Sequence, residues 1–433
     1  MKRFTFPLNP KSSALSSTSA LSSAHSTRKV HHPKARLVFH ETGLELLRTS
    51  VEASDCSAPS SPEASAMPWY TVQNVDEVFS PALLVYPDRI RANLDRMIRY
   101  AGGTARLRPH VKTHKMAEVI QLQLQAGIDR FKVATFAEAE MVAGCGAAEV
   151  LIAYPLVGPN ARRFSQLIAA YPAVRFATLA DSSEVARGLS AVLAAAGQQA
   201  EVLLEIDAGM HRTGVAAGPA AAALYRELAQ LPGIVPGGFH VYDGHIRDLD
   251  LEERVAHTEQ EFAPVAALKK LLEAEGLPVP RVICGGTPTF PCHARHADRE
   301  LSPGTCVFWD VGYATKFPDL EFEPAAAVLT RVISKPAANR LCLDLGYKAI
   351  ASDNPDPRVR ILELPDAKMV VHSEEHLVLE TPKAGEFRIG DALYGIPWHI
   401  CPTCALYQEA VVVESGRATG RWRVVARDRI LKV

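Results

Sequence analysis

The segment RLRPHVKTHK, residues 106–115, gathers the residue types that can do the most chemistry in this chain. Lys112 stands at the junction between a predicted strand and a predicted helix, with His110 and His114 beside it. Neighbouring cations and partial burial lower the pKa of a lysine and make its amine a nucleophile. A basic cluster at this place also occurs as a solvated strand edge, so the residue types alone make Lys112 a candidate.

A glycine pair in the sequence CGGTPT has the chemistry of a phosphate site. Gly285 and Gly286 let a ligand approach the backbone closely, and consecutive N–H groups together with the hydroxyl of Thr287 can cradle an anion. Gly-Gly turns are common, so the motif gains weight only from its position after a late strand, where barrel phosphate sites gather.

The sequence PWHICPTC near the carboxyl end holds two metal-ligand residue types. His399 and Cys401 are two positions apart, and in a strand both side chains would point to the same side and reach one metal ion. Two half-buried strand residues would give the same pattern. Cys404 completes a CxxC, but a zinc ribbon needs a second such pair, which the chain lacks, and we interpret Cys404 as a bystander.

Short apolar runs alternate with segments of helical periodicity between Trp69 and residue 323. Such alternation predicts a parallel sheet buried on both faces. About eight units favour an α/β fold of the (β/α)8 TIM-barrel type over an open doubly wound sheet, which stays an alternative. The strand-like runs are ALLVY, ARLRPHVKT, FKVAT, VLIAYP, RFATLAD, EVLLEID, GGFHVYDGH and RVICGGTPT.

Two further regions flank this predicted barrel. Residues 324–433 alternate in a β-like pattern and predict a smaller C-terminal β domain, which the first strand, ALLVY, can also join. Residues 1–68 predict a disordered leader or targeting segment, because residues 1–40 contain no acidic residue and resemble an organellar transit peptide. A leader without function, or a start codon assigned too far upstream, fits the same pattern.

Composition narrows the class of protein. The net charge is −1 and 48% of the residues are hydrophobic, which indicates a soluble globular protein without an electrostatic reason to bind nucleic acid or a membrane surface. No apolar run approaches the roughly 18–20 residues that span a bilayer. The eight scattered cysteines indicate reduced thiols and a cytoplasmic location, with an organelle as the alternative if the leader is a transit peptide.

The segment RPHVKTHK resembles the cofactor-lysine segment of the D-threonine aldolase and D-serine dehydratase family, and the resemblance extends from Trp69 to Val433. Members of that family share the fold of alanine racemase, a barrel followed by a β domain. The resemblance implies that Lys112 forms the Schiff base with pyridoxal 5′-phosphate (PLP) and that Lys115 is structural. The similar segment EIDAGMHRTG implies that Arg212 hydrogen-bonds the phenolic oxygen of the cofactor.

Three further segments carry the resemblance. GFHVYDGH is similar to the aldolase members and implies that His245 acts as a base near the β-hydroxyl and that Tyr242 lines the cofactor ring. The segment PWHICPTC implies that His399 and Cys401 bind a divalent metal, zinc or manganese. ELSPGTC departs from the family sequence RPGTY at Ser302 and Cys306, so any role of those side chains is not carried over.

The family therefore implies a PLP- and metal-dependent lyase of β-hydroxy-D-amino acids that dimerises with itself. The VYDGH segment favours an aldolase that splits D-threonine into glycine and acetaldehyde, whereas the His-x-Cys pair resembles the zinc pair of the D-serine dehydratases. An amino-acid racemase would need a second acid–base group, usually a tyrosine, and no metal pair. A non-catalytic PLP-binding protein would lack the β domain.

Overall fold

The computed structural model describes residues 67–433, so the predicted leader lies outside the described residues except for Met67 and Pro68. The helices are α1 (Pro87–Ala101), α2 (Ala117–Gln125), α3 (Phe136–Gly144), α4 (Pro159–Ala170), α5 (Ser183–Ala195), α6 (Pro219–Leu228), α7 (Leu251–Ala274), α8 (Phe290–Ala294), α9 (Val311–Lys316) and α10 (Ile400–Leu406). The strands are β1 (Ala82–Val85), β2 (Arg130–Val133), β3 (Glu149–Pro155), β4 (Arg175–Ala180), β5 (Ala200–Asp207), β6 (Val215–Ala216), β7 (Ile234–Val241), β8 (Val282–Cys284), β9 (Arg299–Leu301), β10 (Ala326–Ala337), β11 (Arg340–Leu343), β12 (Val359–Ile361), β13 (Lys368–His372), β14 (Leu377–Glu380), β15 (Ala392–Pro397), β16 (Glu409–Glu414) and β17 (Arg417–Arg423). None of these helices is both long and apolar enough to cross a bilayer.

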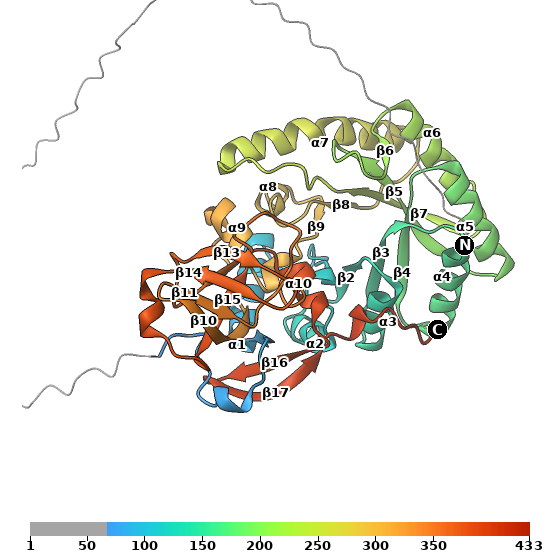
Figure 1. Ribbon diagram of the computed structural model, residues 1–433. Coiled ribbons are helices and arrows are strands. Elements are labelled where there is room, and N and C mark those ends of the chain that lie inside the picture. The colour runs from blue at the N-terminus through green and yellow to red at the C-terminus, as the bar shows by residue number, and fades with distance from the viewer. Residues whose placement is uncertain (1–66) are drawn as a thin grey trace, which may run out of the picture. The chain divides into compact units, whose positions relative to one another are not determined.

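A curled parallel sheet forms the first part of the described chain (Figure 1). Its strands follow the order β2-β3-β4-β5-β7-β8-β9. The segment 107–110 closes the ring, because Leu107 forms a parallel bridge with Leu301 of β9 and His110 forms one with Lys132 of β2. The predicted (β/α)8 barrel followed by a smaller, mostly β part is thereby confirmed.

One strand of the predicted barrel belongs elsewhere. The run ALLVY is β1, which pairs antiparallel with β10 and parallel with β16 in the C-terminal sheet. Its place in the barrel is taken by β9, which pairs with β8 on one side and bridges to the segment 107–110 on the other. Sequence periodicity did not find β9, because it is three residues long and follows a helix of only five.

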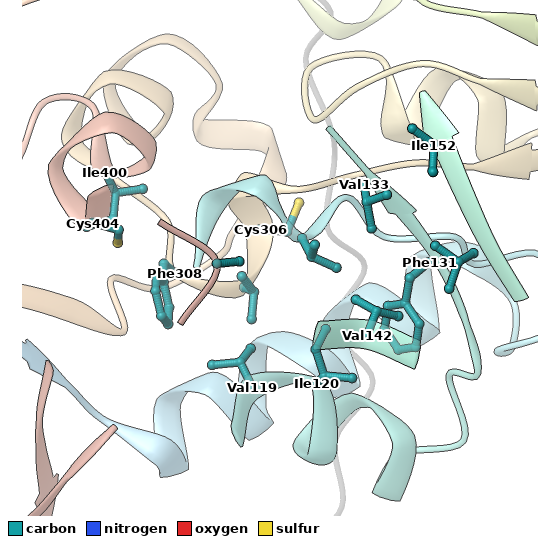
Figure 2. Packing of buried hydrophobic residues seen from close by; sticks show 14 of the residues in the cluster. Val119, Ile120, Phe131, Val133, Val142, Ile152, Cys306, Phe308, Ile400 and Cys404 are labelled. Carbon is teal, nitrogen blue, oxygen red and sulfur yellow. The ribbon is translucent and has the colours of Figure 1, made fainter. Parts of the chain in front are cut away.

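The apolar runs of the barrel strands are almost fully buried because helices cover their outer side and side chains fill the interior. The same core continues from the helices around β2 to the C-terminal part. Figure 2 shows Ile400 and Cys404 of α10 in one cluster with Phe308 and Phe131. Because these side chains lose their contact with water together, α10 is held firmly against the barrel.

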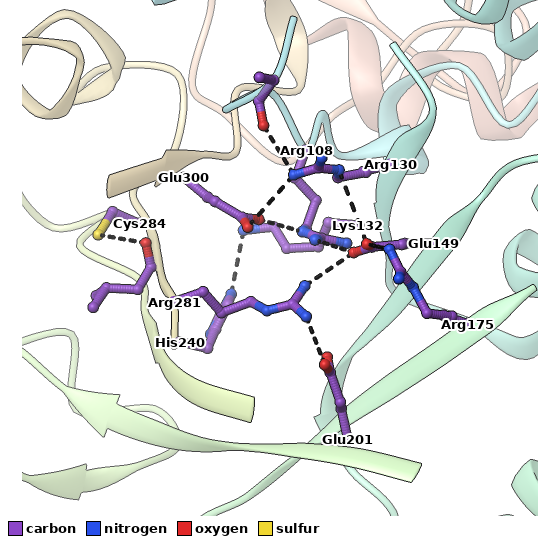
Figure 3. A network of polar contacts seen from close by, with 12 residues as sticks. Arg108, Arg130, Lys132, Glu149, Arg175, Glu201, His240, Arg281, Cys284 and Glu300 are labelled. Carbon is purple, nitrogen blue, oxygen red and sulfur yellow. Dashed lines mark hydrogen bonds and ion pairs between the residues drawn. The ribbon is translucent and has the colours of Figure 1, made fainter. Parts of the chain in front are cut away.

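The amino-terminal end of the barrel is closed by buried ion pairs (Figure 3). The guanidinium of Arg108 donates to Glu149 at 2.7 Å and to Glu300 at 2.8 Å, and Arg281 donates to Glu149 at 2.9 Å. Burial works against the charged form of Glu149, but the hydrogen bonds and charges of Arg108 and Arg281 lower its pKa to about 2. This end is filled and charge-compensated, which leaves the carboxyl-terminal end of the strands for a ligand.

Candidate active site

Lys112 lies in the short 3-10 helix η2 (Val111–Thr113), which begins directly after the barrel segment 107–110. The ring nitrogen Nδ1 of His110 accepts a hydrogen bond from the backbone N–H of Lys112 at 3.3 Å. Burial and the charges of Lys112 and Lys132 hold the pKa of His110 well below its usual value, so the ring is neutral and can accept. A fixed turn therefore presents the amine of Lys112 at the carboxyl-terminal end of the barrel.

Three cations surround the ring of Tyr242, which directly follows β7. The Cζ atom of Arg212 lies 4.9 Å from the ring centroid, and the Nζ atoms of Lys132 and Lys112 lie 5.7 and 6.0 Å from it. The ring also packs on the glycine pair, since a Cβ atom at Gly286 would lie 3.0 Å from Tyr242 Cε2. The structure thus brings together Lys112, Arg212, Tyr242 and Gly286, which come from four separate sequence segments.

Lys132 is a site residue that the motifs did not point to. Its side chain is 3% exposed, and its Nζ lies 3.3 Å from Nε2 of His240, whose Nδ1 pairs with Glu205 at 2.5 Å. Burial, together with the charge of Lys112, lowers the pKa of Lys132 to about 7. A lysine inside the apolar run FKVAT was the one available signal in the sequence.

The glycine pair follows β8 and is buried, as is Thr287. Gly285 has φ +70°, and a Cβ atom there would lie 2.7 Å from the ring of His293, so a larger residue would force the loop apart. Asp243 anchors the loop, because it accepts hydrogen bonds from Thr289 Oγ1 and pairs with His293 Nε2, both at 2.7 Å. The loop is thus rigid and free of side-chain bulk, as close approach of a phosphate requires.

The predicted metal pair does not lie in a strand. β15 ends at Pro397, His399 is the residue that precedes α10, and Cys401 lies in the first turn of α10. The physical reason is Pro402, which has no N–H for a strand ladder but fits the first turn of a helix. The carboxylate of Asp310 also fixes this helix start by accepting the N–H of Ile400 at 3.1 Å.

His399 and Cys401 nevertheless lie close enough to shift the pKa values of one another. The Nδ1 atom of His399 pairs with Asp353 at 2.5 Å. Although burial acts in the opposite direction, Cys401 and Asp353 raise the pKa of His399 to about 9, and His399 and Lys112 lower the pKa of Cys401. Burial raises the pKa of Cys404 well above its usual value, which keeps that thiol protonated.

The donor set of this pair suits zinc, since imidazole nitrogen and thiolate sulfur are its preferred ligands. Asp353 has the place of an outer carboxylate that orients a metal-bound histidine. Within residues 67–433 no three His, Cys, Asp or Glu side chains form a metal-binding group. Two protein ligands leave the remaining coordination positions to water or substrate.

A cavity of about 250 Å³ lies beside His399. It is lined by residues from both parts of the fold, among them Pro288 beside the glycine loop, Asp310, Tyr313 and Arg247. The volume suits a small molecule, and the arginine and a nearby lysine, Lys316, offer positive charge to a carboxylate.

His245 lies apart from this cavity. It lines a second one of about 390 Å³ together with His257 and Glu261 of α7, and the two cavities share no lining residue. The rings of His245 and His257 meet edge to face at 6.1 Å, and the Nδ1 atom of His245 is buried without a partner among the described residues. The predicted role of His245 as a base is therefore not supported by a contact with the Lys112 cluster and stays a prediction.

Family models agree with this architecture. Residues 85–311 match the alanine racemase N-terminal domain, and residues 325–413 match the serine dehydratase domain. The chain belongs to the D-threonine aldolase and D-serine dehydratase family of alanine-racemase-like proteins.

Relatives with aldolase and with dehydratase names match over nearly the same part of the chain. A D-threonine aldolase of Arthrobacter is 29% identical over 356 residues, which cover 81% of this chain and 93% of the relative. The D-threo-3-hydroxyaspartate dehydratase of Delftia is 28% identical over 79% of this chain and 96% of its own length. Family membership therefore shows relatedness to both reaction types.

Solved structures place the fold in the same group. The D-threonine aldolase from Filomicrobium marinum superposes with a TM-score of 0.77 at 28% identity, covering 82% of this chain and 97% of that one. An alanine racemase of Clostridium difficile gives a TM-score of 0.63 at 15% identity, over 80% of this chain and 99% of that one. The second likeness shows the shared fold alone.

Proposed function

We propose that this chain is a PLP- and divalent-metal-dependent lyase of β-hydroxy-D-amino acids, of the aldolase type that converts D-threonine into glycine and acetaldehyde. The convergence of Lys112, Lys132 and Arg212 on the Tyr242 ring carries the proposal. An aromatic, anionic aldehyde needs an amine for attachment, positive charge around it and an aromatic wall. This site supplies all three at the open end of the barrel.

The residues present also fit the phosphate group of PLP. The glycine pair keeps the loop free of side chains, so its backbone can approach a phosphate closely, and a Cβ atom at Gly285 would lie only 2.7 Å from the ring of His293. Lys112 would hold the cofactor covalently, Arg212 would donate to its phenolic oxygen, and Tyr242 would line its ring. Once bound, the cofactor would withdraw electrons from the bond that breaks at the α-carbon of the substrate.

The remaining groups would act on the β-hydroxyl and the carboxylate of the substrate. His399 and Cys401 would hold the metal ion, whose charge polarises a hydroxyl oxygen. Arg247, in the cavity beside His399, would pair with the carboxylate. In the aldolase route His245 is the proposed base that accepts the proton of the β-hydroxyl. In the alternative dehydratase route Lys112 would accept the proton of the α-carbon.

A dehydratase is the second candidate, and the His399–Cys401 pair favours it. The Delftia dehydratase, which matches with a TM-score of 0.70 at 28% identity, has also been solved as a cysteine mutant in a metal-free form and as a histidine mutant. A dehydratase would release the β-hydroxyl and yield a 2-oxo acid and ammonia.

The decisive experiment incubates the full chain with PLP, Mn²⁺ or Zn²⁺, and D-threonine, with L-threonine as the stereochemical control. Glycine and acetaldehyde in equal amounts support the aldolase. 2-Oxobutyrate and ammonia overturn it in favour of the dehydratase. Borohydride reduction followed by peptide mass spectrometry tests the cofactor assignment, which predicts the label on Lys112 and its loss in Lys112→Ala. We further propose that the chain forms a homodimer, which light scattering of the purified protein tests.

A further inference from the structure

Lys132 is the second lysine beside the Tyr242 ring, and its position is fixed by the backbone of the barrel. It lies in β2, whose register places it opposite His110, and its N–H donates to the carbonyl of Pro109 at 3.0 Å. With 3% of the residue exposed, the side chain points into the barrel interior rather than to solvent.

A chain of hydrogen bonds crosses the barrel from this amine, and Figure 3 shows its first contact, between Lys132 and His240. The carboxylate of Glu205 can only accept, so His240 carries its proton on Nδ1 and its Nε2 is an acceptor. The ammonium of Lys132 therefore donates to Nε2 of His240. The other oxygen of Glu205 accepts from Thr213, the residue next to Arg212, so the chain ends at the loop that carries the third cation.

The donors of Lys132 are not all used. An ammonium group has three N–H donors, and His240 accepts one of them. Among residues 67–433 no carboxylate forms an ion pair with Lys132, although the group is buried. A buried charge without a counter-ion is unfavourable, and an anion bound beside the ring 5.7 Å away would supply both an acceptor and a counter-charge.

We infer that Lys132 is a second cofactor-binding lysine, which gives a charge and hydrogen-bond donors to the anionic ring compound held covalently by Lys112. The inference rests on the proposed function, because it takes PLP as that compound. Lys132 is hydrogen-bonded to His240, so we assign different roles to the two lysines. Lys112 forms the covalent bond with the cofactor aldehyde, and Lys132 binds the cofactor by its charge.

The test measures PLP affinity without turnover. In the Lys112→Ala background, where the covalent bond is removed, the dissociation constant of PLP is measured by quenching of protein fluorescence, with and without Lys132→Met. Loss of charge-assisted hydrogen bonds predicts binding weaker by about ten- to a hundredfold. Lys132→Gln keeps a donor but not the charge, and we expect an intermediate loss. Lys115→Met is the control, because Lys115 is ion-paired with Glu138, and its PLP affinity should be unchanged.

Each outcome decides something different. Unchanged PLP affinity in a folded Lys132→Met protein, checked by the thermal melt of the protein without PLP, overturns the inference. If Lys132→Met does not fold, unchanged affinity in Lys132→Gln overturns it. A borohydride label on Lys132 instead of Lys112 also overturns it. Failure of the unsubstituted chain to bind PLP overturns the proposed function.

Discussion

The thiol of Cys401 lies 3.1 Å from the hydroxyl of Thr113, the residue next to Lys112. This contact joins α10, from the C-terminal part, to the turn that presents the reactive amine. The proposed metal pair and Lys112 are therefore positioned by one hydrogen-bonded contact, although almost three hundred residues separate them in the chain. Proposed metal binding by His399 and Cys401 and proposed cofactor attachment to Lys112 therefore both depend on this contact.

Thr113→Val tests the junction, because valine keeps the shape of threonine and loses the hydroxyl. We expect PLP attachment to Lys112 to persist and zinc affinity to fall about tenfold, the usual effect of an outer-shell partner. Competition with a chromogenic chelator measures the affinity, and Cys401→Ala serves as the reference for loss of a ligand. Equal zinc affinity in Thr113→Val and the unsubstituted chain would show that the contact does not affect metal binding by His399 and Cys401.

Asp353→Asn tests the carboxylate behind His399. A neutral asparagine accepts the Nδ1–H group of His399 more weakly than the carboxylate does, so zinc binding should weaken by about 10–100-fold. Asp356→Asn is a matched control in the same loop, since Asp356 pairs with Arg358 and is largely exposed. Isothermal titration of both variants decides the point, and a similar loss in both would refute a specific role of Asp353.

The place of Lys112 was predictable from sequence for a physical reason, because it stands at the carboxyl end of a strand-like run and in a barrel those ends meet on one face. Arg212 and Tyr242 were predicted from the family resemblance, since a loop arginine and a barrel tyrosine carry no such signal by themselves. Lys132 was not predictable in the same way, because it lies within a strand and its direction depends on the register between β2 and the segment 107–110.

The rest of the site depends on contacts that the sequence does not encode locally. Asp353 and His399 are 46 positions apart and meet only through the fold. The metal pair was expected in a strand, but Pro402 and the Asp310 cap place it at a helix start. β1 and β9 could be assigned only from their partners, because a four-residue and a three-residue run carry no periodicity that separates one sheet from another.

Arg108→Met should lower the free energy of unfolding strongly. Arg108 is 1% exposed, and its removal leaves Glu149 and Glu300 with fewer counter-charges in a buried place, which costs about 3–5 kcal/mol. Urea denaturation measures this loss. Arg175→Met is the control, because Arg175 contacts the same Glu149 but its side chain is 73% exposed, so we expect less than about 1 kcal/mol. Equal losses in the two variants would contradict the prediction that burial sets the difference.

Lys132 should make the stability of the protein without PLP depend on pH in a particular direction. Its pKa falls from 10.5 in the unfolded chain to about 7 in the folded one, because of burial first and the charge of Lys112 second, while Glu205 and Asp243 oppose the shift. Between these values the unfolded state binds more protons, so stability should rise with pH from about 7 towards 10.5. The facing groups His240 and Cys284 are buried, and they stay neutral over most of this range because their pKa values are lowered and raised respectively.

Lys132→Met removes this contribution, so the stability curve of the variant should be flatter by a few kcal/mol between about pH 7 and pH 9. Urea denaturation of both proteins at these two pH values measures the difference. The advantage of the variant over the unsubstituted chain should be largest near pH 7, where the lysine is most often charged. Parallel curves for the two proteins would mean that the amine of Lys132 is not desolvated in the folded state.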